Sequence, residues 1–369
     1  MAIERQMSPR IELVNIKHPD GDPRVFPPEF VDALKGDGWT VYVNSDGKGL
    51  GLKIPQAEYE KSGASFVDTK KIPQDTVILT LRYPPEDFVD LLEPGTVLIS
   101  MAHFPTRIER STFLHRREIN AIALDQITDD KGKRLVENLQ LVAKNGLEDA
   151  ITAIREHSPG LLNEAYIEAT IIGSGNIQSH FVNAATHQKD IKIIPRTIGR
   201  EITSNPDLLK KVLQQTHLLV DATQRIDPKD PIVPNEMIAL LPEDAVLLDL
   251  CVDPDLIGEN GEIISQTGIQ GIPKGDLVKD IFTVNDPRWN DIPPEIPHDV
   301  RRIVISCYSW PGRNPERSMQ VYAEQLLPLL HALKEFGYDA LSTESDNPYV
   351  RALARGSLKY FMEKEGLLI

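Results

Sequence analysis

Short apolar segments alternate with amphipathic segments through most of the 369-residue chain, and this alternation restricts its fold more than any other feature. The apolar stretches 11–16, 40–45 and 76–82 predict strands, while 27–38 and 107–119 have the apolar spacing of helices. Strands that alternate with helices are typical of a parallel sheet covered by helices on both faces. The sequence therefore predicts an α/β protein with Rossmann-like, doubly wound parallel sheets.

The alternation occurs in two series. A long helical pattern at about 134–157 is interrupted by "HSPGLLNEAY" (157–166), and a second series begins at "YIEATIIGSG". A chain of this length is too long for one ordinary core, so we expect two domains with a cleft between them. The further predicted strands are 96–104, 121–127, 191–194, 217–223, 245–253 and 301–308, and the further predicted helices are 204–215 and 319–337.

Charge and cysteine content exclude several classes of protein. The net charge of −15 argues against nucleic acid or an anionic membrane as a partner. No apolar run approaches the roughly 20 residues needed to cross a bilayer, and the N-terminus does not have the pattern of a signal peptide. Cys251 and Cys307 form no CxxC motif, so we expect a cytoplasmic protein. No metal-ligand spacing is present, and we expect no metal.

The stretch "TIIGSGNIQ" (170–178) predicts a strand, a glycine turn and a helix. Gly173 permits a tight turn, Gly175 lets the backbone approach a pyrophosphate, and the following helix directs its N–H groups at that anion. Gln178 occupies the position of the usual third glycine. The predicted dinucleotide-binding residues of this turn are Gly173, Ser174, Gly175, Asn176 and Ile177.

The residues after the predicted strand 191–194 bear on the choice of cofactor. An acid that would bind the adenosine ribose is missing, and Arg196 and Thr197 are found there instead. Arg196, together with Arg200, favours the 2′-phosphate of NADP over NAD. The alternative is that both arginines are solvated surface charges. Thr223, after the strand 217–223, is a further predicted cofactor contact.

Polar residues follow several predicted strands, where doubly wound sheets bind their ligands. Two arginines can hold a carboxylate, and a histidine can exchange a proton near neutral pH. For each residue alone, a surface or structural role is the competing interpretation. The predicted substrate and catalytic residues are Arg24, Arg82, His103, Asp125 and Arg134 in the first domain and Asp253 in the second.

Five blocks of the sequence resemble, in order, the superfamily of alanine dehydrogenase, the pyridine nucleotide transhydrogenase α-subunit and saccharopine dehydrogenase. They are "PRVFPPEFVDALKGDGWTVYV", "LRYPPEDFVDLLEPGTVLISMAHF", "GSGNIQ", "LLDLCVD" and "WPGRNPERSMQVYAEQLLPLL". The resemblance implies a discontinuous substrate domain of residues 1–150 and 309–369, with a dinucleotide-binding Rossmann domain at 160–308. It also implies a homo-oligomer.

The same resemblance implies residue roles. Arg24 matches the arginine that binds the substrate carboxylate, His103 the catalytic histidine, and Asp253 the aspartate on the cofactor side. The family's substrate lysine falls on Arg82, which keeps the charge but cannot relay a proton. "LDQITDDKGKRLVENLQLVAKNG", with Asp125 and Arg134, resembles the saccharopine branch, whereas the Pro-Gly crossover resembles alanine dehydrogenase, so the branch stays open.

The sequence thus predicts an NAD- or NADP-dependent oxidoreductase of amino-acid metabolism. It would act on a C–N bond, by imine reduction or oxidative deamination, with a 2-oxo acid or amino acid as its small-molecule substrate. One alternative is a nucleotide-binding regulator with altered catalysis, motivated by Gln178, Arg82 and the missing ribose acid. Another is a transhydrogenase-type subunit, against which the missing ribose acid argues.

Overall fold

A computed structural model describes residues 9–15, 22–45, 54–67, 72, 75–223, 225, 227–251 and 254–367. The chain divides into two compact units, Met1–Asn138 with Pro315–Ile369, and Leu139–Asn314. Each unit is an α/β structure, as predicted. The predicted Asp253 lies outside the described residues, and the predicted cleft between domains stays a prediction. Within the described ranges, no helix is both long and apolar enough to cross a bilayer.

The first unit contains a parallel sheet of six strands in the order β3-β2-β1-β4-β5-β6. Neighbouring strands are in register, so that Ile11 lies between Val41 and Val77. The predicted strands 40–45 and 76–82 have the bounds expected. The strands are β1 (Arg10–Asn15), β2 (Thr40–Ser45), β3 (Ser65–Val67), β4 (Thr76–Arg82), β5 (Val97–Met101) and β6 (Asn120–Ala123).

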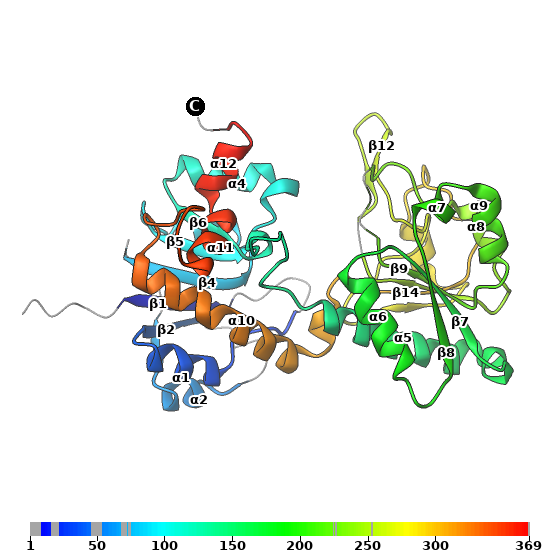
Figure 1. Ribbon diagram of the computed structural model, residues 1–369, viewed down its shortest axis with the longest axis horizontal. Coiled ribbons are helices and arrows are strands. Elements are labelled where there is room, and N and C mark those ends of the chain that lie inside the picture. The colour runs from blue at the N-terminus through cyan, green and yellow to red at the C-terminus, as the bar shows by residue number, and fades with distance from the viewer. Residues whose placement is uncertain are drawn as a thin grey trace, which may run out of the picture. The chain divides into compact units, whose positions relative to one another are not determined.

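Helices cover both faces of this sheet. One core cluster joins the strands to α1, α10 and α11, and a second joins them to α3, α4 and α12. The C-terminal helices, orange to red in Figure 1, therefore pack in the unit that contains the N-terminal strands. The helices are α1 (Pro28–Gly36), α2 (Gln56–Lys61), α3 (Glu86–Val89), α4 (Ile108–Arg116), α10 (Pro315–Phe336), α11 (Pro348–Gly356) and α12 (Leu358–Lys364), with short 3-10 turns η1 (Phe104–Thr106) and η2 (Leu124–Gln126).

The second unit contains a sheet in the order β13-β14-β10-β9-β7-β8. The short strand β13 is antiparallel to β14, so this sheet is mixed, with its other strands parallel as predicted. The strands are β7 (Ile167–Ile172), β8 (Ile193–Ile198), β9 (Leu218–Asp221), β10 (Val246–Asp249), β13 (Ile281–Phe282) and β14 (Ile303–Ser306), with a separate pair of β11 (Leu256–Ile257) and β12 (Ile263–Ser265).

Helices again pack on both faces of the second sheet. One core contains side chains of α5 and α6, and the other contains side chains of α8 and α9. Asn205 caps α8 as its Asn-Pro start predicted, because its side chain accepts hydrogen bonds from the N–H groups of Asp207 and Leu208. The helices are α5 (Leu139–His157), α6 (Asn176–Thr186), α7 (Arg200–Thr203), α8 (Pro206–Leu213) and α9 (Asn235–Ile238), with 3-10 turns η3 (Pro159–Asn163), η4 (Pro287–Asp291) and η5 (Trp310–Arg313).

The helix predicted at 134–157 begins later than expected. Thr128 and Arg134 form an antiparallel bridge instead, and α5 starts only at Leu139. The whole of α5 belongs to the second unit, whereas the predicted boundary assigned residues up to 150 to the first. The turn "TDDKGKR" accounts for the difference, because Gly132 takes a positive φ of 78° that favours a turn over a helix.

Candidate functional site

Four predicted residues lie at one edge of the first sheet. Arg24 follows β1, Arg82 ends β4, His103 follows β5, and Asp125 lies in η2 after β6. These strands are neighbours in the order β1-β4-β5-β6 and run parallel, so their carboxyl ends form one continuous edge. This is the edge at which doubly wound sheets bind ligands.

Arg24 and Arg82 meet at the carboxylate of Asp22. The Arg24 side chain donates from Nε and Nη2, the latter at 2.7 Å, and Arg82 Nε donates at 2.8 Å. Burial acts to raise the pKa of Asp22, but the hydrogen bonds and charge of Arg24 and the charge of Arg82 outweigh it and lower the pKa to about 2. Asp22 is therefore a permanent anion that fixes both guanidinium groups.

Tyr322 of α10 adds a polar group to this cluster. Its side chain is buried, and burial raises the pKa of its hydroxyl against the opposing charges of Arg24 and Arg134. Arg134 donates from Nη2 to the Val136 carbonyl at 3.2 Å. Arg24 and Arg82 thus face one aspartate, which leaves a net positive charge, and the charge of Arg134 acts on Tyr322 beside them.

His103 has a left-handed backbone, with φ 54° and ψ 44°. Such a conformation is rare for a residue other than glycine and costs of order 1–3 kcal/mol. Hydrogen bonds hold it on both sides. The His103 N–H donates to Asp125 Oδ1 at 3.0 Å, and Arg110 Nη1 donates to the preceding Ala102 carbonyl at 3.1 Å.

The imidazole of His103 is paired with the buried carboxylate of Asp125. Nδ1 lies 3.4 Å from Asp125 Oδ2, and the side chain of His103 is 52% exposed. Burial acts to raise the pKa of Asp125, but the hydrogen bonds and charge of His103, with a bond from Gln126, lower it to about 2. Asp125 is therefore ionised near neutral pH and favours the ring with a proton on Nδ1, which leaves Nε2 for an exchange of protons with substrate.

The glycine turn of the second unit has the shape that a pyrophosphate site requires. Gly173 has φ +123°, and a Cβ there would collide with the Ala222 carbonyl at the end of β9. A Cβ on Gly175 would meet no atom within 4 Å, so space is open in front of the exposed N-terminus of α6. No side chain caps that helix. The residues present therefore fit a dinucleotide phosphate.

Gln178 lies on α6 where a third glycine would allow close packing. It is half-buried, while Phe181 and Ala185 form the buried face of the helix. The Gln178 side chain therefore does not separate helix and sheet.

Arg196 lies inside β8 rather than after it. The strand continues to Ile198, not to 194, and Arg196 is paired in the ladder with Thr170. Its Nε is 2.7 Å from Glu168 Oε1. The residues that follow the strand are Gly199, Arg200 and Glu201, and Glu201 accepts a hydrogen bond from the Gly199 N–H. The position that reads the adenosine ribose is therefore expected at 199–201.

This shift gives a prediction about the cofactor. If a 2′-phosphate is bound, Arg200→Ala should weaken NADPH binding by about tenfold, the cost of one lost charged hydrogen bond. Arg196→Ala is the matched control, since Glu168 already neutralises it, and should leave the NADPH Kd nearly unchanged. Fluorescence titration of both variants measures this. A larger loss of NADPH affinity in Arg196→Ala than in Arg200→Ala would instead support Arg196 as the residue that binds the 2′-phosphate.

Two buried aspartates lie at the ends of β9 and β10. Asp221 and Asp249 are neighbours in the parallel ladder. Asp221 accepts hydrogen bonds from the N–H and hydroxyl of Thr223, the predicted cofactor contact, at 3.0 and 2.7 Å. Lys274 Nζ donates to Asp249 Oδ2 at 2.9 Å. Thr223 thus lies at the predicted edge, but both of its donors are engaged by Asp221.

A family comparison covers most of the N-terminal part of the first unit. Residues 20–144 match the family model described as "Alanine dehydrogenase/PNT, N-terminal domain". The superfamily predicted from the sequence is confirmed.

Two solved structures share the fold of this chain. An L-alanine dehydrogenase superposes with a TM-score of 0.66 and 16% identity, over 94% of this chain and 94% of that one. A transhydrogenase from Sinorhizobium meliloti superposes with a TM-score of 0.62 and 17% identity, over 88% and 94%. At these identities the likeness shows the fold.

The sequence patterns did not predict the roles of Asp22 in the first unit and of the Asp221–Asp249 pair in the second unit. Asp22 stands two residues before Arg24, a spacing that allows a local ion pair. Asp221 and Asp249 each end an apolar strand, "LLVD" and "VLLD". For this pair, the sequence signal was an acidic residue at the end of each buried apolar strand. In the described part of the chain, no group of three or more His, Cys, Asp or Glu could hold a metal ion.

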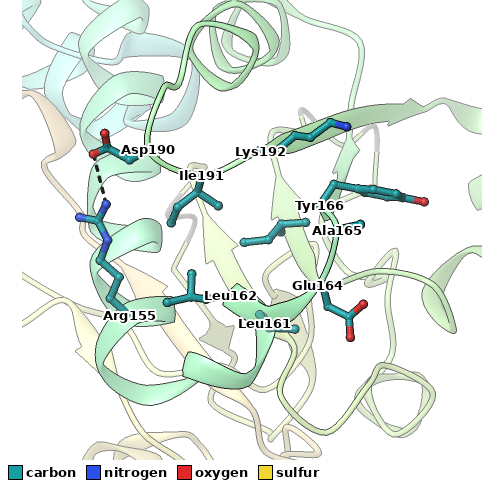
Figure 2. Close-up of a pocket in the computed structure, with 10 residues that line it drawn as sticks. Arg155, Leu161, Leu162, Glu164, Ala165, Tyr166, Asp190, Ile191 and Lys192 are labelled. Carbon is teal, nitrogen blue, oxygen red and sulfur yellow. Dashed lines mark hydrogen bonds and ion pairs between the residues drawn. The ribbon is translucent and has the colours of Figure 1, made fainter.

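A pocket of about 270 Å³ lies at the opposite edge of the second sheet, before β7 and β8. Figure 2 shows an apolar floor that includes Leu161, Leu162 and Ile191, with the ion pair of Arg155 and Asp190 at its side. None of the predicted site residues lines it. Its position at the amino ends of the strands separates it from the glycine turn of the same unit.

Proposed function

We propose that this chain is a nicotinamide-dependent oxidoreductase that acts on the C–N bond of an amino acid or its imine. The observation that supports this most is the pairing of His103 with Asp125 on the sheet edge that also carries Arg24 and Arg82. A proton-exchanging group and a carboxylate-binding group then share one edge. The proposal assigns substrate binding to the first unit and dinucleotide binding to the second.

In this proposal the arginine cluster anchors the substrate carboxylate. Asp22 holds Arg24 and Arg82 in fixed orientations, which lowers the conformational entropy lost when a substrate binds. Arg24 and Arg82 carry two positive charges against the one negative charge of Asp22, so a second carboxylate is attracted rather than repelled. Neither Arg24 nor Arg82 can release its proton, so proton transfer falls to another group.

His103 is the proposed general acid and base. Asp125 holds Nδ1, so that Nε2 can donate a proton to the substrate nitrogen or oxygen and take it back in the reverse direction. The left-handed backbone of His103 determines the direction in which its imidazole projects from the carboxyl end of β5.

The turn at 173–178 is the proposed dinucleotide site. The N–H groups that begin α6 would bind the pyrophosphate, and Gly175 leaves room for it. When bound, the nicotinamide supplies hydride transfer. In the sequence, Arg196 slightly favours NADP, but this residue lies inside β8 and is paired with Glu168. The choice of cofactor therefore depends on the residues after the strand, where Arg200 favours NADP and Glu201 favours NAD.

A second candidate function is a nucleotide-binding regulator without turnover. The observation that favours it is Asp22, a carboxylate of the chain itself that already engages both substrate arginines. On this view the arginine cluster is structural. The second unit would then bind a dinucleotide, and no substrate would be converted.

A substrate panel tests the proposal. Purified protein is incubated with NADH or NADPH, a set of 2-oxo acids, and either ammonia or a primary amine, while oxidation of the dinucleotide is followed by absorbance. We expect oxidation that requires both the 2-oxo acid and the amine. Tight dinucleotide binding with no oxidation across the panel would favour the regulator instead.

A further inference from the structure

The carboxyl ends of β7 and β9 meet at the point where the second sheet changes direction. From β7 the chain continues outward to β8 on one side, and to β9, β10 and β14 on the other. The Ala222 N–H donates to the Ile172 carbonyl, and Gly173 is packed against Ala222. Doubly wound sheets bind dinucleotides across this switch point, with the adenosine half over the second strand. In a dinucleotide bound in this way, the nicotinamide half would extend over the ends of β9 and β10.

Among the residues described at those ends, one lysine contacts a pair of carboxylates. Lys274 donates to Asp249, and Ser306 of β14 and the Cys251 N–H donate to it as well. Asp221 is buried beside Asp249 and accepts hydrogen bonds from the N–H and hydroxyl of Thr223 and from the Cys251 thiol at 3.7 Å. An ionised Asp221 therefore adds a second negative charge beside that of Asp249.

We infer that Asp221 determines the preference of the second unit for the oxidised over the reduced nicotinamide dinucleotide, and makes that preference depend on pH. The inference rests on the proposed dinucleotide binding. The two forms carry the same phosphates and differ in the charge of the ring, which is positive only when oxidised. An ionised Asp221 attracts that ring, and a protonated Asp221 does not.

The pH range follows from the surroundings of Asp221. Burial and the neighbouring charge of Asp249 raise its pKa to about 6, against the lowering effects of Thr223 and Lys274. Among the described residues, the other charged or titratable groups near the two carboxylates are Lys274, Cys251 and Asp255, and Arg225 acts on Asp255.

Binding measurements across pH test the inference. The Kd values of NAD⁺ and NADH, or of the NADP pair if that is bound, are measured by calorimetry from pH 5 to 7.5. We expect the affinity of the oxidised form relative to the reduced form to rise about tenfold as the pH increases. This is the size of effect expected when the carboxylate of Asp221 attracts the positive nicotinamide ring through a partly solvent-screened interaction. Contributions from the phosphates cancel in this ratio.

Asp221→Asn keeps the acceptor for Thr223 and removes the charge, so its ratio should not change with pH. Asp255→Asn is the matched control, since Asp255 also has a raised pKa near Lys274, and should behave like the wild type. ADP-ribose, which lacks the nicotinamide, should bind both variants alike. If Asp221→Asn does not fold, proton release by the wild type replaces it: near pH 6, binding of the oxidised form should release protons that binding of the reduced form does not.

The outcomes separate the inference from the proposed function. A ratio that is flat in the wild type, or that changes equally in Asp221→Asn, overturns the inference while dinucleotide binding stands. If neither form binds at any pH, dinucleotide binding itself fails and the inference fails with it.

Discussion

Replacing His103 by Asn should lower turnover by about 10²–10⁴-fold, the usual contribution of a general acid–base group. Asparagine removes the titrating ring but keeps a side chain that can adopt a left-handed backbone, so the turn should survive. The Kd of the dinucleotide should not change, because His103 lies in the first unit and the glycine turn in the second. Steady-state kinetics and calorimetry on one preparation measure both quantities.

Asp125→Asn is the companion variant for this prediction. It should reduce kcat less than His103→Asn does, because the amide can still accept from the His103 N–H but no longer holds the imidazole by charge. The double variant should lose no more activity than His103→Asn alone, since Asp125 acts on the reaction only through the ring. Normal turnover in His103→Asn, or an additive loss in the double variant, would contradict the assignment of the pair.

Gly173→Ala should destabilise the second unit by about 2–5 kcal/mol, which combines a strained backbone with a collision in a packed region. The φ of +123° excludes an ordinary side chain, and the Cβ would collide with the Ala222 carbonyl, which belongs to the backbone and cannot rotate away. Dinucleotide binding should fail as the β7–β9 junction opens. Denaturant unfolding followed by circular dichroism measures the loss.

Gly175→Ala separates stability from binding. Its φ of −93° suits any residue, and its Cβ would meet no protein atom within 4 Å, so the free energy of unfolding should change by less than about 1 kcal/mol. If this open space receives a pyrophosphate, the Kd of the dinucleotide should rise by about tenfold or more. Unchanged dinucleotide affinity in Gly175→Ala would mean that the ligand does not approach here.

Local patterns predicted the strands well where apolar residues were continuous. The bounds of β2 and β4 agree with prediction, and the family match was foreseen from residues such as Arg24 and His103. The end of β8 was misplaced because the continuous apolar run stops at Ile194, before Pro195 and Arg196. That strand lies at the edge of its sheet, where a proline is tolerated, so the ladder continues to Ile198.

The parts of the site that escaped prediction depend on contacts between distant residues. Asp125 was predicted to bind substrate, and only the neighbouring order of β5 and β6 shows that its carboxylate pairs with His103. Asp22 lies 60 residues from Arg82 in the sequence, so no local pattern links them. The pairing of Asp221 with Asp249 likewise requires the strand order. The sequence shows which residue types lie at the carboxyl ends of the strands, but only the tertiary structure shows which of these side chains contact one another.

Product analysis tests the central claim most directly. The protein is incubated with reduced dinucleotide, a 2-oxo acid and ammonia or a primary amine, and the products are identified by mass spectrometry beside a His103→Asn control. We predict an amino acid with a new C–N bond, formed in step with oxidation of the dinucleotide and nearly absent in the control. Dinucleotide that binds but is never oxidised, with no new C–N bond for any amine or 2-oxo acid, would contradict the account.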